Sequence, residues 1–284
     1  MAMQREGVVY GLPESEYHAP KDELSSTGAK LLLECAAKFK YQVLDGNRVH
    51  RDAYDIGTAV HTKVLGVGAA AVTCPEHLLD SAGGMRTTAA KEWKVAQYLA
   101  GIPVVSVADM TVIDLMAESV LAHPTARMLF EKPGHAEVSV FDEVLGVKRR
   151  GRFDYLPDEG NIAVDLKTTM DASKPGFASS VGKFKYHVQQ AHYLDILRRS
   201  TGRDIGMVFV VVEKTAPYLT GVRTISKQFA EMGDTEAMNA VDIYRRCMES
   251  GVWPGYSDEV EEVGPSMRDI YDYQDRYESG EITL

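Results

Sequence analysis

Two aspartates and a lysine lie close together in the sequence, in an arrangement that could hold a metal ion beside a phosphate. Residues 145–169 are expected to form two strands joined by a Pro-Asp-Glu-Gly-Asn turn. Side chains alternate across a strand, so Asp165 and Lys167 share one face of the second strand, and Asp154 of the first can meet them. Carboxylates bind Mg²⁺ and Mn²⁺, and a neighbouring lysine can orient or deprotonate a water. These residue types suit phosphodiester hydrolysis.

The same stretch also has a purely structural interpretation. Oppositely charged side chains are common on the exposed face of a β-hairpin, where they stabilise strand pairing. From the hairpin alone, a structural Asp/Lys pair and a metal site are equally good interpretations.

Two elements upstream carry residues that could complete a metal site. A helix is expected over residues 53–65, with His61 on its inward face. A lone histidine there is more often a hydrogen-bonded core residue than a ligand. A strand is expected over residues 135–141, where Glu137 could extend the acidic cluster or remain a solvated carboxylate.

A helix expected over residues 186–199 places Gln189 and Tyr193 one turn apart, facing the same way. Both side chains can donate to phosphate, although residues on a helix surface would look the same. Residues 206–213 form the clearest buried strand in the chain, and residues 218–225 should pair with it antiparallel. Elsewhere we expect a loop at 12–18, helices at about 26–44, 87–99, 106–128 and 227–248, an extended piece at 103–105 and a connection at 177–185.

Several of these motifs resemble one nuclease superfamily. Asp154 followed by Asp165-Leu166-Lys167 resembles the Asp…(Asp/Glu)-x-Lys signature of the PD-(D/E)XK nucleases. The stretches at 24–28, 57–61 and 189–193 resemble further motifs of the RecB/RecE-like exonuclease branch, above all phage RecE-type (exodeoxyribonuclease VIII-like) enzymes. The likeness runs from about residue 12 to residue 256.

The resemblance implies an α/β fold with a restriction-endonuclease-like core, in which helices flank a mixed central β-sheet, and a helical N-terminal extension. The metal ligands that it implies for Mg²⁺ or Mn²⁺ are His61, Asp154, Asp165 and the Leu166 backbone carbonyl. Glu137 is a further candidate ligand. Its implied catalytic residues are Asp154, Asp165, Lys167, Gln189 and Tyr193. Lys167 would position or activate the water, and Ser26 would contact DNA.

By the same resemblance, the protein is expected to be a metal-dependent DNA exonuclease that resects double-stranded ends for phage-type recombination or repair. Its expected partners are DNA, as duplex ends or single strands, and a single-strand annealing protein. A structure-selective endonuclease on the same fold and a non-catalytic DNA-binding or assembly protein remain open as alternatives.

The 284 residues suffice for one α/β domain with an extension. We expect a helical part at 1–131 carrying the histidine motif, a nuclease core at 132–256 and an acidic tail at 257–284, forming one compact domain overall. No apolar run approaches the roughly 20 residues that a membrane helix needs, and the first residues do not resemble a secretory signal. We therefore expect a cytoplasmic protein, in the host cell if it is phage-encoded, with no membrane partner.

Three separated cysteines, Cys35, Cys74 and Cys247, form no Cys-x-x-Cys pair and are expected to be buried small side chains. No iron–sulfur cluster is expected, because such clusters take four cysteine ligands.

The net charge of −10 has the wrong sign for a protein that coats nucleic acid. A local basic strip could still meet DNA while the rest of the surface stays acidic. The candidate DNA-binding side chains are Lys148, Arg150, Arg152, Lys183 and Lys185. Since related phage exonucleases form rings, the resemblance implies a ring-shaped homo-oligomer whose channel Lys148, Arg150 and Arg152 would line.

Overall fold

The computed structural model describes residues 6–47 and 53–283, and the chain divides into two units, Met1–Trp253 and Pro254–Leu284. The division falls close to the boundary expected after residue 256. The N-terminal part does not form a unit of its own, because its strands join the same sheet as the core.

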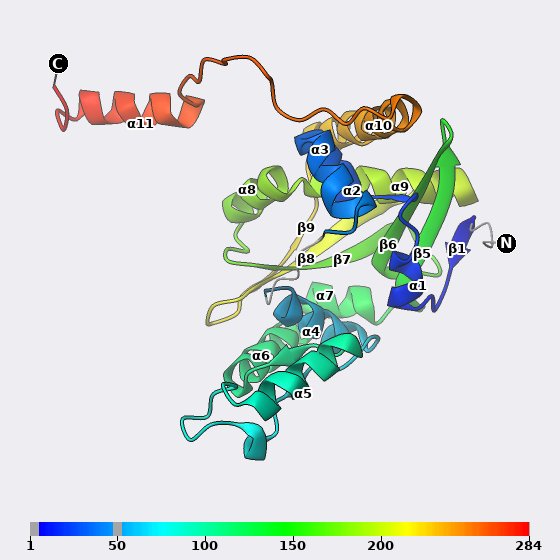
Figure 1. Ribbon diagram of the computed structural model, residues 1–284, viewed down its shortest axis with the longest axis vertical. Helices are drawn as coiled ribbons and strands as arrows, with labels where there is room; N and C mark the ends of the chain where they lie inside the picture. Colours follow the sequence, from blue (N-terminus) through cyan, green and yellow to red (C-terminus); the bar gives the residue numbers. More distant parts are fainter. Residues whose placement is uncertain (1–5, 48–52, 284) are drawn as a thin grey trace. The chain divides into compact units, whose positions relative to one another are not determined.

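Within the described residues of the first unit, the main sheet has seven strands (Figure 1). The β7–β8 and β2–β6 pairs are parallel and the others are antiparallel, so the sheet is mixed. In spatial order it runs β1 (Gly7–Val9), β5 (Gly134–Val144), β6 (Val147–Pro157), β7 (Ile162–Thr169), β8 (Gly206–Glu213) and β9 (Thr220–Arg223), with β2 (Leu24–Ser25) beside β6.

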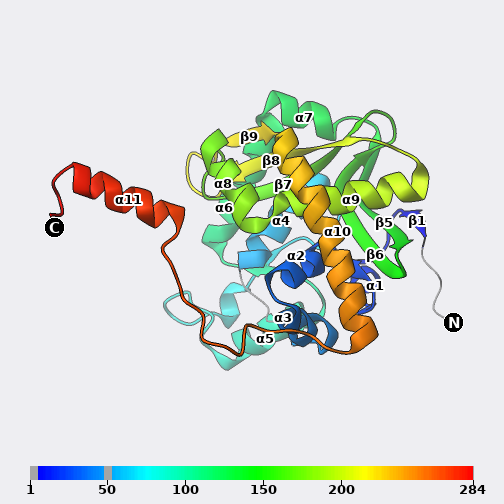
Figure 2. The same cartoon turned by 90° about the horizontal axis from the view of Figure 1, so that it is seen from above.

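One face of this sheet is covered by the helices α2 (Ser26–Glu34), α8 (Lys174–Phe184), α9 (Tyr186–Thr201) and α10 (Lys227–Ser250) (Figure 1). α9 packs directly on the strands, where Ile196 and Leu197 meet Phe209 and Val211. α10 packs in turn against α9 and α2 (Figure 2). This face therefore carries two layers of helix.

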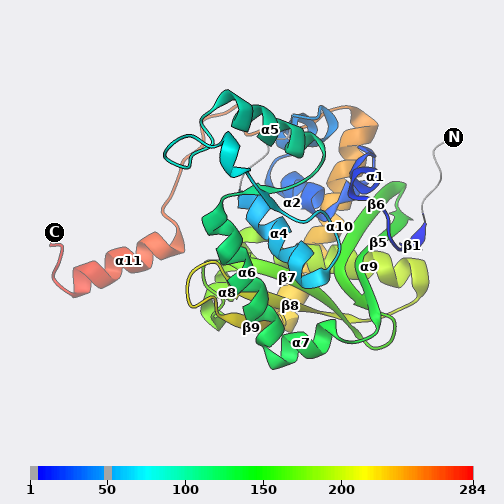
Figure 3. The same ribbon diagram turned by 90° about the horizontal axis from the view of Figure 1, so that it is seen from below.

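The opposite face is covered by α4 (Ala53–Leu65), α6 (Val107–Ala122) and α7 (Pro124–Phe130), with α5 (Thr88–Leu99) further out (Figure 3). Val60 of α4 and Met116 of α6 pack against Leu166 and Val210 of the sheet. Because both faces of the sheet are covered, β8 is almost continuously apolar, as expected for a buried strand. Shorter elements are α1 (Glu14–His18), α3 (Ala36–Phe39), a π-helical turn (Lys40–Leu44), β3 (Val72–Thr73), a 3₁₀ turn (Glu76–Leu78) and β4 (Val104–Val105).

Most elements lie where the sequence predicts them, including α4, β8 and α10, but four predictions were wrong. The helix expected at about 26–44 is broken at Cys35, whose extended backbone separates α2 from α3 and the π-helical turn. The expected connection at 177–185 is part of α8, which Ser173 caps and which buries Phe177 and Val181. The loop expected at 12–18 contains the short α1. The helix expected to run to residue 128 is broken between α6 and α7, because Pro124 starts a new helix that His123 caps.

The second unit contains α11 (Met267–Glu278), which begins at a capping box made by Ser266 and Asp269. Within the described ranges, no helix is long and apolar enough to cross a membrane. All three cysteines are buried, as the sequence predicted.

Candidate metal centre and active site

The site forms where β6 and β7 separate. The two strands are antiparallel, as expected, but they pair at a single position, Tyr155 with Val164, after which β7 follows β8. The Asp154 side chain enters the resulting gap, and its Oδ2 accepts a hydrogen bond from the Leu166 backbone N–H at 2.6 Å. Since the N–H and C=O of one strand residue point to the same edge, the Leu166 carbonyl is also directed towards β6.

Three potential ligands from three elements meet beside this gap. One atom each of His61 on α4, Glu137 on β5 and Asp154 on β6 lies within 4.8 Å of the other two. His61 Nδ1 is 3.6 Å from Asp154 Oδ2, and both side chains are mostly buried. Two carboxylates and an imidazole form a donor set that suits Mg²⁺ or, with nitrogen present, Mn²⁺.

Glu137 occupies this cluster at a cost in backbone energy. Its φ is +54°, although it lies inside a strand whose neighbours Ala136 and Val138 keep regular pairing with β6. A residue other than glycine in this region costs on the order of 1–3 kcal/mol, and such strain is concentrated at functional sites. Burial and the nearby Asp154 carboxylate raise the pKa of Glu137 to about 7. A cation bound between the two carboxylates would relieve this repulsion.

Asp165 lies beside this cluster rather than in it. The sequence placed it on an exposed strand face, but α9 covers that face and the side chain is only 1% exposed. Asp165 Oδ2 forms an ion pair with Lys167 Nζ at 2.5 Å, and Asp165 Oδ1 accepts a hydrogen bond from Gln189 Nε2 at 2.6 Å. Burial raises the pKa of Asp165 against the opposing effect of the Lys167 charge.

Lys167 is held as an ammonium by the carboxylates around it. Burial alone favours the neutral amine, but the carboxylates of Asp165 and Asp154 outweigh it and raise the pKa of Lys167. A protonated lysine can position a water or a phosphate oxygen by hydrogen bonding, whereas it cannot accept a proton. Of the two roles that the sequence left open for Lys167, its protonated state favours positioning the water over activating it.

Gln189 and Tyr193 lie one turn apart on α9 and are both buried. The Tyr193 ring lies against the strand at Gly151, where a Cβ would come within 2.7 Å of the ring atom Cδ1. Ser26 on α2 donates to the Tyr193 hydroxyl at 3.3 Å. Ser26 is buried and was expected to contact DNA, so its position instead supports a role in fixing Tyr193.

The expected basic strip on β6 is not an exposed surface. Arg150 and Arg152 are largely buried, and they donate to the backbone carbonyls of Pro20 at 2.6 Å and Leu12 at 2.9 Å. Both guanidinium groups also lie over the Tyr17 ring, at 5.2 and 4.1 Å from its centre. The two arginines therefore hold the N-terminal segment on the sheet, which contradicts the prediction that they line a DNA channel.

The other predicted DNA contacts are more accessible. Lys148 is 53% exposed, and Lys183 is exposed on α8. Lys185 is half-buried and forms an ion pair with Glu236 at 2.6 Å. Sequence reasoning missed Lys30 on α2, whose Nζ lies 3.3 Å from Gln189 Oε1. Its position one turn after Ser26 on the same helix was the available signal.

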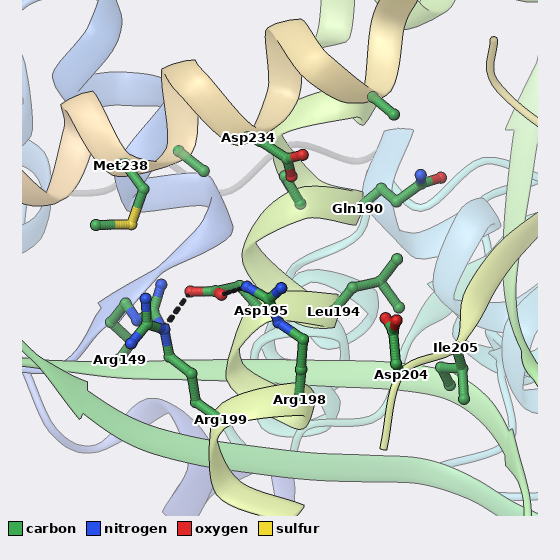
Figure 4. Close-up of a pocket in the computed structure, with 13 residues that line it drawn as sticks. Arg149, Gln190, Leu194, Asp195, Arg198, Arg199, Asp204, Ile205, Asp234 and Met238 are labelled. Atoms are coloured by element: carbon green, nitrogen blue, oxygen red, sulfur yellow. Dashed lines mark hydrogen bonds and ion pairs between the residues drawn. The ribbon is translucent and has the colours of Figure 1, made fainter. Parts of the chain in front are cut away.

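A pocket between α9 and α10 is lined by none of the candidate site residues (Figure 4). Its wall contains Arg149, which is buried and paired with both Asp142 and Asp195 at 2.9 Å. Although burial acts in the other direction, hydrogen bonds from Arg198, Arg199 and Arg149 lower the pKa of Asp195 to about 2. These pairs join β6 to α9, so the network is structural.

The fold has a counterpart among solved structures. A protein from Eubacterium rectale described as "Putative exonuclease" aligns with a TM-score of 0.62 at 16% identity, over 92% of this chain and 98% of that chain. An alkaline exonuclease from Laribacter hongkongensis, LHK-Exo, aligns with a TM-score of 0.28 at 12% identity, over 70% of this chain and 95% of that chain. No curated protein matches the sequence.

The E. rectale likeness and the observed sheet confirm the expected fold class, an α/β core with a mixed sheet flanked by helices. A family model described as "PDDEXK-like domain of unknown function (DUF3799)" matches residues 25–264, which is most of the chain. The expected relation to the PD-(D/E)XK superfamily is confirmed, and the chain belongs to this PDDEXK-like family.

Proposed function

We propose that this protein is a metal-dependent nuclease that hydrolyses phosphodiester bonds in DNA. The observation that carries the proposal is the convergence of His61, Glu137 and Asp154 beside the buried Asp165–Lys167 pair. Membership of a PDDEXK-like family supports it. A structural hairpin would require neither the strained Glu137 backbone nor a histidine from another element at the same point.

Different side chains would bind the metal ion and position the water. His61, Glu137 and Asp154 would hold Mg²⁺ or Mn²⁺, with Asp165 and the Leu166 carbonyl as further ligands. A divalent ion held there stabilises charge on the phosphate and lowers the pKa of a bound water. Lys167 would hydrogen-bond the attacking water or a phosphate oxygen, in line with its protonated state.

Two residues of α9 would support this arrangement. Gln189 fixes the orientation of Asp165 through the hydrogen bond between its Nε2 and the Asp165 carboxylate. Tyr193, buried behind the site, would donate to phosphate or keep the neighbouring strand in place. Both side chains are preorganised, so little rearrangement is needed when substrate binds.

We further propose that the enzyme is an exonuclease that resects duplex ends in phage-type recombination or repair. The motifs at 24–28, 57–61 and 189–193 support this finer assignment, because they resemble RecE-type exonucleases in type and order. The description of the E. rectale protein as an exonuclease points in the same direction.

Digestion of closed-circular and linear forms of one plasmid tests both levels of the proposal. Wild-type protein is compared with Asp154→Asn, which keeps the side-chain shape, and with Glu143→Gln, an exposed change on β5 that serves as the control. Reactions contain Mn²⁺, Mg²⁺ or EDTA. We expect the wild type and the control to release mononucleotides from linear DNA when metal is present. We expect no release from closed-circular DNA, in EDTA or with Asp154→Asn.

The other outcomes are equally informative. Nicking of the closed circle would replace the exonuclease assignment by an endonuclease. An intact wild-type protein that binds DNA but cleaves neither form in either metal would contradict the nuclease proposal and favour a non-catalytic DNA-binding protein.

A further inference from the structure

Lys30 lies beside the candidate site but is not one of the site residues predicted from the sequence. Two hydrogen bonds join α2 to α9: Ser26 Oγ donates to the Tyr193 hydroxyl, and Lys30 Nζ donates to Gln189 Oε1, both at 3.3 Å. Gln189 Nε2 in turn donates to Asp165 Oδ1 at 2.6 Å. Lys30 is therefore one side chain away from Asp165, on the site's α2 wall.

Two lysine side chains, Lys30 and Lys167, meet at this wall near the Asp165 carboxylate. Lys30 Nζ lies 5.4 Å from the centre of the Tyr186 ring, and Lys167 Nζ lies 5.3 Å from the same centre. Lys167 is neutralised by its ion pair with Asp165. Among the residues that the structure describes, no carboxylate forms an ion pair with Lys30. Protonated Lys30 therefore has no ion-pair partner of its own within the part of the chain that the structure describes.

Protonation of Lys30 has an energetic cost at this position. Burial and the charge of Lys167 lower the pKa of Lys30 to about 7, so the protonated amine is less favoured than in an ordinary lysine. An anion beside Lys30 would supply the missing counter-charge and favour the ammonium form. The hydrogen bond to Gln189 alone needs no charge, since a neutral donor would serve equally well.

We propose that Lys30 binds a non-bridging oxygen of a DNA backbone phosphate, next to the phosphate contact of Lys167. The identity of the anion rests on the proposed nuclease function. Lys30 would then be a phosphate-binding residue contributed by α2, opposite the ligands contributed by α4, β5 and β6. It would hold the substrate strand against the α9 side of the site.

Three variants separate charge from structure. Lys30→Gln removes the charge but keeps a donor for the Gln189 oxygen, Lys30→Arg keeps the charge, and Lys91→Gln removes one charge from an exposed lysine of α5. The dissociation constant for a short 3′-labelled DNA duplex is measured by fluorescence anisotropy in EDTA, where no cleavage occurs, over a series of KCl concentrations. Circular dichroism checks the fold of each variant, and Lys30→Met replaces Lys30→Gln if that variant is unfolded.

We expect Lys30→Gln to bind about tenfold more weakly, the effect of losing one hydrogen bond to a charged group. The slope of log affinity against log salt should become shallower by about one, because one fewer phosphate is neutralised. Lys30→Arg and Lys91→Gln should retain the wild-type slope.

A wild-type affinity and slope in a folded Lys30→Gln protein would overturn the inference. So would slower cleavage with unchanged DNA binding, because Lys30 would then act only through Gln189. Failure of the proposed function gives a different result: wild-type protein would cleave no DNA with metal, whether or not the Lys30 variants change the binding slope in EDTA.

Discussion

Replacing Glu137 by glutamine should stabilise the metal-free protein. The pKa of Glu137 rises from 4.5 to about 7 on folding, because the carboxylate is buried beside Asp154. Such a rise corresponds to about 3 kcal/mol of lost stability once the group is ionised in both states. The side chain is 29% exposed, so solvent screening makes this value an upper estimate.

The sign of the effect sets its pH dependence. A carboxyl group whose pKa is raised on folding binds its proton more tightly in the folded state. The penalty is therefore absent below about pH 4.5, grows as the pH rises through 4.5 to about 7, and is complete above about 7. Glu137→Gln has no charge to desolvate, so its advantage over wild type should follow the same course.

Urea unfolding in EDTA at pH 5 and pH 8 measures this difference directly. Glu143→Gln, an exposed change on the same strand, is the control for the loss of one negative charge. We expect Glu137→Gln to exceed wild type by up to about 3 kcal/mol at pH 8 and by much less at pH 5. Equal stabilities at pH 8, or an advantage that is the same at both pH values, would refute the reasoning.

Four further outcomes are expected. His61→Ala should weaken Mn²⁺ binding by calorimetry while changing the metal-free melting temperature little; the reverse would make it a core histidine. Asp165→Asn should abolish cleavage and cost about 3 kcal/mol in urea unfolding, because it leaves the Lys167 ammonium without its buried partner, and Asp165→Asn with Lys167→Met should recover that loss. Gly151→Ala should cost about 1–3 kcal/mol by forcing the Tyr193 ring away, and a smaller side chain at Tyr193 should reduce the effect of the alanine. Sedimentation should show a defined oligomer, and competitor DNA added after initiation should barely slow digestion; a monomer that competitor arrests would contradict the ring.

Strong local patterns predicted much of the fold. The apolar run of β8 and the periodic face of α4 are set by burial, which leaves a regular trace in sequence. α8 was missed because its Lys-Pro-Gly start and serines have low helix propensity, and its two buried apolar residues give too weak a pattern. Whether such a segment forms a helix depends on its tertiary packing.

The candidate site shows the same limit. Alternation along β6 and β7 gives the face on which each side chain lies, but not what covers that face. The sequence therefore named Asp165 and Arg150 as candidate site residues and expected both to be exposed, whereas both are buried. The sequence also could not show that β6 and β7 separate after one paired position. This separation allows the Asp154 carboxylate to accept a hydrogen bond from the Leu166 backbone N–H.

The packing of α2 against the last helix of the first unit bears on how the protein is made. α2 packs against α10, and Phe39 at the end of α3 packs against Tyr244 at 5.7 Å and Trp253 at 5.6 Å between ring centres. A ribosome synthesises α2 early and α10 some 200 residues later. During that interval the α2 wall lacks its outer support, and contacts between such distant segments form late in folding. The phosphate contact proposed for Lys30 should therefore form only after α10 has emerged.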